Sequence, residues 1–161
     1  MKAIALDLLA VIDAMEPRLH QISDAVASKK PAPGKWSKKE ILGHLIDSAS
    51  NNQQKFVRTL LTDKTIDFVG YDQDAWVNAQ QYNQQKWLDI IPLWASMNRH
   101  LAHIIRNVES AKLDNTIWVS GLGPYTLAFI MPDYVEHLKH HLLQIIPDAG
   151  LKSTFSMTPY V

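Results

Sequence analysis

The segment WSKKEILGHLIDSASNNQQKF, residues 36–56, decides how the chain folds. Ser37 followed three residues later by Glu40 is a capping box, which marks the N-terminus of a helix. After it, apolar residues recur at intervals of three and four, as they do on the buried face of an amphipathic helix. The pattern predicts a helix over residues 37–61, with His44 at the flank of its apolar stripe.

Three other segments have the same periodicity, at residues 4–26, 84–108 and 126–146. Four helices of similar length with near-heptad apolar stripes are typical of a four-helix bundle. With 161 residues, 47% of them apolar, the chain is long enough to bury one core. We therefore expect an all-α fold in a single domain over residues 1–161.

The connections carry further signals. Residues 62–82, between the second and third helices, form a connection too long to be a simple turn. DNTIWVSGLGPYT (114–126) contains a short extended piece and a glycine-rich turn. Pro132 falls inside the fourth helix, so we expect either a kink there or a helix that starts at this proline.

Composition excludes several classes of protein. Sixteen basic residues balance sixteen acidic ones, which does not favour nucleic acid or an anionic membrane as a partner. No apolar stretch approaches the roughly 20 residues that cross a bilayer, and the N-terminus lacks the features of a signal peptide. The absence of cysteine suits the cytoplasm. It also means that any bound metal is held by imidazole and oxygen.

The segment EHLKHHLLQI (136–145) places three of the seven histidines in five positions. They could be surface residues, core histidines or metal ligands. Each helical residue advances about 100°, so His137 and His141 lie about 40° apart beside the apolar stripe, whereas His140 turns toward the polar side. An i, i+4 histidine pair is the spacing of helical zinc sites. It needs a third ligand, and His44 qualifies only if the second and fourth helices meet.

The other histidines lack such a pattern. His100 and His103 lie opposite the apolar stripe of their helix, and His20 has no partner in sequence. We leave these three outside the site.

Three stretches together resemble the DinB-like and YfiT-like four-helix-bundle metalloproteins: GKWSKKEILGHLIDSASNNQQKF (34–56), YDQDAW (71–76) and the segment 126–141, which ends in HLKHH. The resemblance implies a bundle whose second and fourth helices face one another across a divalent metal. The implied ligands are His44, His137 and His141. Three neutral imidazoles and an open position describe a catalytic zinc site, and nickel suits it equally.

The resemblance also implies an enzyme acting on a small-molecule substrate, either a hydrolase or a transferase that uses a low-molecular-weight thiol as co-substrate. In either chemistry the metal supplies a nucleophile at neutral pH. Asp47 is our candidate for the general base or for orienting a ligand, with Glu136 as another base and Asn51 as another orienting residue. Four residues of the long connection are candidates for lining or covering the mouth of the site, or for capping the core: Tyr71, Asp72, Asp74 and Trp76.

Two alternatives remain open. The first is a non-catalytic metal-binding or stress-associated bundle, whose aromatic residues would permit a homodimer. The second is a vestigial site that holds no metal. A polar cavity beside the histidines would favour the enzyme, whereas a metal enclosed by protein ligands would exclude it.

Overall fold

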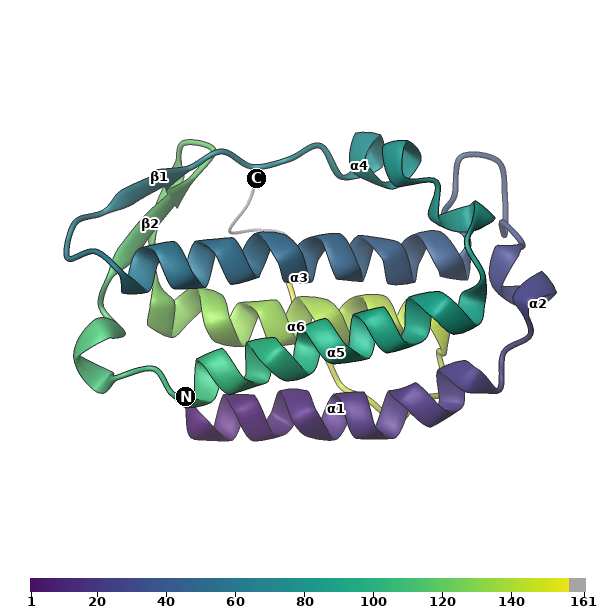
Figure 1. The fold of residues 1–161 in the computed structure, drawn as a ribbon, viewed down its shortest axis with the longest axis horizontal. Coiled ribbons are helices and arrows are strands. Elements are labelled where there is room, and N and C mark those ends of the chain that lie inside the picture. Colours follow the sequence, from purple (N-terminus) through teal and green to yellow (C-terminus); the bar gives the residue numbers. More distant parts are fainter. Residues whose placement is uncertain (157–161) are drawn as a thin grey trace.

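The computed structural model describes residues 1–156, and its four long helices form a bundle (Figure 1). Both α1 and α3 pack against α5 and α6, so α1 and α3 occupy opposite corners. The predicted four-helix bundle is confirmed. Its helices are α1 (Lys2–His20), α3 (Lys38–Leu60), α5 (Trp87–Arg106) and α6 (Leu127–Ile145).

Neighbouring helices α3 and α5 run in the same direction, which explains the long connection between them (Figure 1). The 23 residues of α3 span about 34 Å, and the chain must return over this length before α5 begins. Along the way it forms three short elements that lie beside α3. These are β1 (Ile66–Phe68), α4 (Gln73–Gln80) and the 3₁₀ turn η1 (Tyr82–Gln84).

The prediction of an all-α fold is wrong, because three short strands form a sheet at one end of the bundle. Strand β2 (Thr116–Val119) pairs antiparallel with β3 (Leu122–Thr126) through a tight turn, and parallel with β1. The turn uses Ser120 and Gly121 with positive φ, as hairpins with a right-handed twist require. The extended piece within residues 114–126 was foreseen, but its partner β1 lies some fifty residues earlier in the sequence.

The first helix also differs from expectation, whereas the fourth has its predicted bounds within one residue. The N-terminal helix ends at His20, and a separate short helix α2 (Asp24–Ser28) follows, capped by the Ser23 hydroxyl, which accepts a hydrogen bond from the Val26 amide. Helix α6 starts at Leu127 rather than at Pro132, which lies inside it. Within residues 1–156, no helix is both long enough and apolar enough to cross a membrane.

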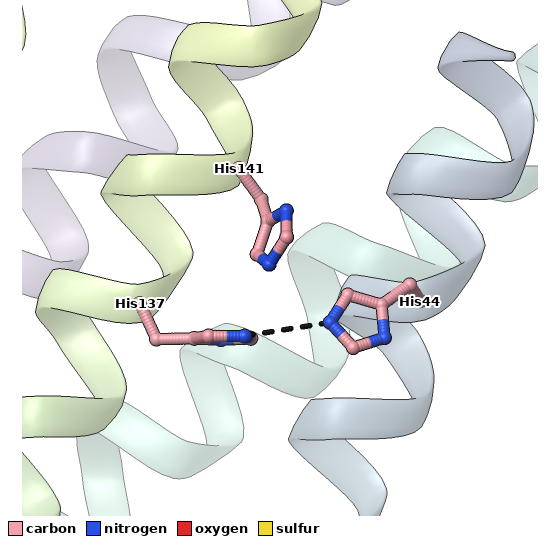
Figure 2. Close-up of side chains that lie close together, drawn as sticks. All are labelled: His44, His137 and His141. Atoms are coloured by element: carbon pink, nitrogen blue, oxygen red, sulfur yellow. Dashed lines mark hydrogen bonds between the residues drawn. The ribbon is translucent and has the colours of Figure 1, made fainter. Parts of the chain in front are cut away.

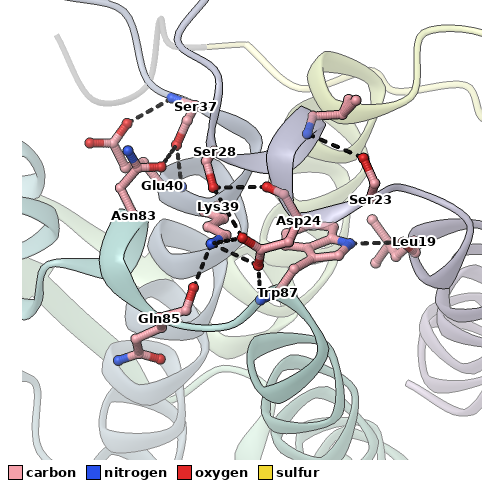
Figure 3. A network of polar contacts seen from close by, with 11 residues as sticks. Leu19, Ser23, Asp24, Ser28, Ser37, Lys39, Glu40, Asn83, Gln85 and Trp87 are labelled. Atoms are coloured by element: carbon pink, nitrogen blue, oxygen red, sulfur yellow. Dashed lines mark hydrogen bonds and ion pairs between the residues drawn. The ribbon is translucent and has the colours of Figure 1, made fainter.

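A polar network joins α1, α2, α3 and α5 at one end of the bundle (Figure 3). The buried ammonium of Lys39 forms an ion pair with Asp24 and donates a hydrogen bond to the Gln85 carbonyl. Asp24 also accepts from the Trp87 amide, and the Trp87 indole donates to the Leu19 carbonyl. These contacts hold the N-terminal end of α3 in place, about one and a half turns before His44.

The predicted capping box at the start of α3 is confirmed. The Ser37 hydroxyl accepts from the Glu40 amide, and the Glu40 carboxylate accepts from the Ser37 amide. The Ser37 hydroxyl also donates to the Asn83 side chain, 2.8 Å away. The start of α3 is thereby tied to the end of the long connection.

Candidate metal centre

Three imidazoles from two helices converge in the bundle (Figure 2). His44 projects from α3, and His137 and His141 project from successive turns of α6. The Nε2 atoms of His44 and His137 are 3.4 Å apart, and one ring nitrogen from each of the three histidines lies within 4.8 Å of the others. The structure therefore brings together the three residues that were predicted as ligands.

The neighbouring histidine is oriented differently. The ring of His140 packs against Phe155, 5.6 Å between centroids, and its Nε2 contacts the Gln144 amide. His20, His100 and His103 are exposed on the surface of the bundle. The helical wheel predicted the orientation of these histidines correctly because all of them lie on regular α-helices.

The surroundings keep the three imidazoles neutral. Burial, together with the nearby His141 ring, lowers the pKa of His44 to about 3. Burial and the neighbouring imidazoles hold the pKa of His137 well below its usual range. Burial also lowers the pKa of His141, partly offset by its hydrogen bond to Gln144. A neutral imidazole keeps a lone pair for a metal, whereas an imidazolium does not.

The distance between the His44 and His137 nitrogens fits a shared metal ion. In a tetrahedral site with metal–nitrogen bonds of about 2.05 Å, two ligand nitrogens lie about 3.3 Å apart, close to the observed 3.4 Å. His141 Nδ1 lies 3.0 Å from the Gln144 side-chain oxygen. This contact makes Nδ1 the protonated nitrogen and leaves Nε2 free to bind. The three histidines could therefore hold a divalent metal.

Apart from the contact of its Nε2 with His137, the His44 ring is held by packing. Its ring lies 5.1 Å from that of Trp36, which precedes the N-cap of α3. Among residues 1–156, its buried Nδ1 has no hydrogen-bond partner. Contact with the Trp36 ring thus limits the rotation of the imidazole.

Asp47 makes its hydrogen bonds away from the imidazoles. Its Oδ1 accepts from the Tyr82 hydroxyl at 2.7 Å and from the Gln80 amide, both in the long connection. The Asn51 side chain donates to the Asp47 carbonyl within α3. The roles suggested for Asp47 and Asn51 beside the metal remain predictions, and the contacts seen here tie α3 to the connection that covers it.

Glu136 anchors the C-terminal segment. Its carboxylate accepts hydrogen bonds from the Thr154 amide and hydroxyl and from Lys139, and its carbonyl accepts from the Ser153 hydroxyl. These bonds lay the segment along α6 and bring Phe155 to 5.0 Å from the His137 ring. The segment after α6 therefore forms part of the wall around the histidines, which sequence reasoning did not foresee.

A cavity of about 320 Å³ opens beside the three histidines. It runs along the groove between α3 and α6, under the long connection. Polar and apolar side chains both line it, and the polar ones beyond the histidines include Ser48, Asn52, Lys55 and Asp133. The apolar or aromatic lining comes from Tyr71, Val119, Ile130, Tyr134 and Phe155.

The long connection contributes to this cavity only in part. Tyr71 lines it and packs against Trp76 at 4.7 Å between ring centroids. Trp76 itself is exposed, Asp74 is exposed, and Asp72 caps α4 through the Ala75 amide. Of the four residues considered at the mouth of the site, Tyr71 is the one that faces the cavity.

The helical wheel could have revealed the cavity residues that sequence reasoning missed. On α3, Ser48 and Lys55 lie within about 40° of His44, four and eleven residues further on. On α6, Asp133 precedes His137 by one turn. Residues on the same helical face as a histidine, one or more turns away, were the signal for these cavity residues. Only the packing of α3 against α6 shows that the two faces meet.

The depressed histidine pKa values predict a pH-dependent stability for the metal-free protein. In the unfolded chain the pKa of His44 is about 6.5, so between pH 7 and pH 5 the unfolded state gains a proton that the folded state does not. The lowered pKa of His44 therefore contributes to the free energy of unfolding above pH 6.5. As the pH falls to 5 this contribution is lost, which lowers the free energy of unfolding by about 2 kcal/mol from His44 alone. The shifts at His137 and His141 have the same sign and add to this loss.

Urea denaturation in the presence of a chelator, at pH 7, 6 and 5, measures this effect. The His44→Leu variant should show a weaker pH dependence than the wild type. Equal slopes for the two proteins would contradict the prediction.

Comparison with known proteins gives two matches. Residues 7–145 match the sequence profile of the DinB superfamily. Among solved structures, the chain is similar to YfiT from Bacillus subtilis, described as "a probable metal-dependent hydrolase with an unusual four-helix bundle topology". The TM-score is 0.78 at 19% identity, over 90% of this chain and 83% of that one, which shows a shared fold. A search of the curated proteins finds no match.

Proposed function

The chain belongs to the DinB superfamily, and we propose that it is a metal-dependent hydrolase of small amides or esters. One observation carries the proposal: three neutral imidazoles converge at the wall of a cavity that has further polar groups. YfiT, whose fold it shares, is described as a probable metal-dependent hydrolase. A structural metal would be enclosed by protein ligands, whereas these histidines border open space.

His44, His137 and His141 would hold the metal, which we propose to be zinc or nickel. Such an ion supplies a Lewis acid and a nucleophile at neutral pH. The chain itself determines the shape of the site. Trp36 packs against the His44 ring, and Phe155 packs against the His137 ring.

Hydrolysis adds the oxygen of water to the acyl carbon and breaks its bond to nitrogen or oxygen, and the leaving amine or alcohol takes up a proton. A side chain in the cavity must transfer that proton. Among the described residues that line the cavity, Asp133 is the one carboxylate. It lies one turn before His137 on α6. We therefore favour Asp133 over Asp47 and Glu136, neither of which lines the cavity.

The test is a screen of protein purified without an affinity tag and loaded with zinc or nickel. We expect it to hydrolyse members of a panel of small esters and amides, and we expect chelation to abolish the activity. Asp133→Asn should lower kcat by about 100-fold while leaving the bound metal in place. The matched control is Asp47→Asn, in which the cavity wall is unchanged.

Other outcomes would point to the competing functions. Turnover that requires an added low-molecular-weight thiol would make the protein a transferase. Bound metal without turnover in either assay would favour the non-catalytic bundle, and protein without metal would favour a vestigial site.

A further inference from the structure

We propose that the cavity binds substrates that carry one carboxylate, and that Lys55 pairs with this carboxylate while the bond to be cleaved lies at the histidines. The placement of the cleaved bond at the histidines rests on the proposed function. Carboxylate binding at Lys55 concerns a separate group in the same cavity and can be tested without turnover.

Lys55 is placed for this role by the helix that carries His44. The two residues are eleven positions apart on α3 and differ by about 20° around its axis, which places them on one face about 16 Å apart along the helix. Helical side chains lean toward the N-terminus, which for Lys55 is the direction of His44. The Lys55 side chain lines the same cavity as the three histidines. A ligand in the groove can therefore contact both Lys55 and the histidines.

The ammonium of Lys55 has few partners in the protein. It lies 5.4 Å from the centroid of the Phe68 ring, and no hydrogen bond or ion pair formed within residues 1–156 engages it. Burial lowers the pKa of Lys55, and the charge of Asp133 partly offsets this. A partly desolvated cation that forms no ion pair within residues 1–156 is costly, and a bound carboxylate would offset that cost.

The balance of charge favours a carboxylate over a phosphate. With a divalent metal at the histidines, the cavity carries three positive charges and the single negative charge of Asp133. An anion is attracted, but Asp133 in the wall opposes a second negative charge on the ligand. One ammonium also matches one carboxylate, whereas phosphate sites in proteins usually add arginine or backbone amides.

The remaining lining indicates the rest of the ligand. Tyr71, Tyr134, Ile130 and Phe155 contribute apolar surface to the cavity that Lys55 and the histidines share. An acyl group with a small aromatic or branched apolar part would bury this surface. The substrate class is thus a small amide or ester with an apolar part and a single carboxylate.

Two probes of nearly the same shape, one charged and one neutral, test the proposal. N-benzoylglycine carries a carboxylate, an amide bond and a phenyl ring, and N-benzoylglycinamide replaces the carboxylate with a neutral amide. Calorimetry should show that N-benzoylglycine binds the wild-type protein at least about 10-fold more tightly than N-benzoylglycinamide. Lys55→Met should remove this preference, and Lys55→Arg should retain most of it.

Three controls separate the role of Lys55 from other effects. Arg58→Met is the matched variant, because Arg58 lies 5.7 Å from the same Phe68 ring but does not line the cavity; it should keep the preference. Thermal unfolding of Lys55→Met should match that of the wild type. The preference should also persist in metal-free His137→Ala, which shows that the carboxylate is not simply bound by the metal.

The outcomes distinguish the two proposals. An equal affinity for both probes, or a preference that survives Lys55→Met, would overturn the assignment of Lys55. A Lys55-dependent preference in a protein that hydrolyses no ester or amide would uphold it and refute the hydrolase. If hydrolysis occurs, Lys55→Met should raise KM for carboxylate substrates and leave kcat and neutral substrates nearly unchanged.

Discussion

His44→Ala should abolish metal binding, with a loss of affinity of at least about 100-fold, and hydrolysis should disappear with it. His44 is the one member of the cluster contributed by α3, so its removal leaves two ligands on a single helix. Two imidazoles cannot define the three-ligand face that catalytic zinc sites use. Metal analysis of protein purified without an affinity tag measures the effect, and His137→Ala should behave in the same way.

The adjacent histidine provides the control for this experiment. His140→Ala removes an imidazole from the same segment of α6 but from outside the cluster, so bound metal should stay near the wild-type level. Circular dichroism should show that all variants keep their helical content. If bound zinc or nickel is unchanged in His44→Ala and His137→Ala, the three-histidine assignment is wrong.

Gly43→Ala should destabilise the protein by about 2–4 kcal/mol, although helix propensity alone predicts a gain of about 1 kcal/mol. A Cβ atom at position 43 would lie 2.2 Å from two atoms of the Tyr82 ring. Tyr82 is buried, and its hydroxyl donates to Asp47. The added methyl group must displace the ring, which combines overpacking with the loss of a hydrogen bond to a carboxylate.

A double-mutant cycle identifies the cause of this loss. In the Tyr82→Leu background the ring is absent, so adding Gly43→Ala should be neutral or stabilising. Chemical denaturation of the four proteins measures the coupling. If Gly43→Ala is equally harmful with and without Tyr82, the contact between glycine and ring is not the reason for glycine at this position.

Local sequence determined the helices and the relation among residues on each of them. The capping box at Ser37 set the start of α3, and the 100° advance per residue separated His137 and His141 from His140. Such inferences succeed because neighbours on one helix have a fixed geometry whatever surrounds the helix. The same rule failed after His20, where the cap at Ser23 starts a new helix that is tied to Lys39 and Trp87.

Only the tertiary structure determined the contacts between one helix, strand or segment and another. Periodicity along α3 placed His44 on a face, and a family resemblance suggested its partners, but only the packing of α3 against α6 brings the three imidazoles within 4.8 Å. The sheet, the hydrogen bonds of Asp47 and the anchoring of the C-terminal segment by Glu136 are likewise long-range contacts. A sequence pattern records which face of a helix is buried, whereas the identity of the neighbour depends on how all the faces pack at once.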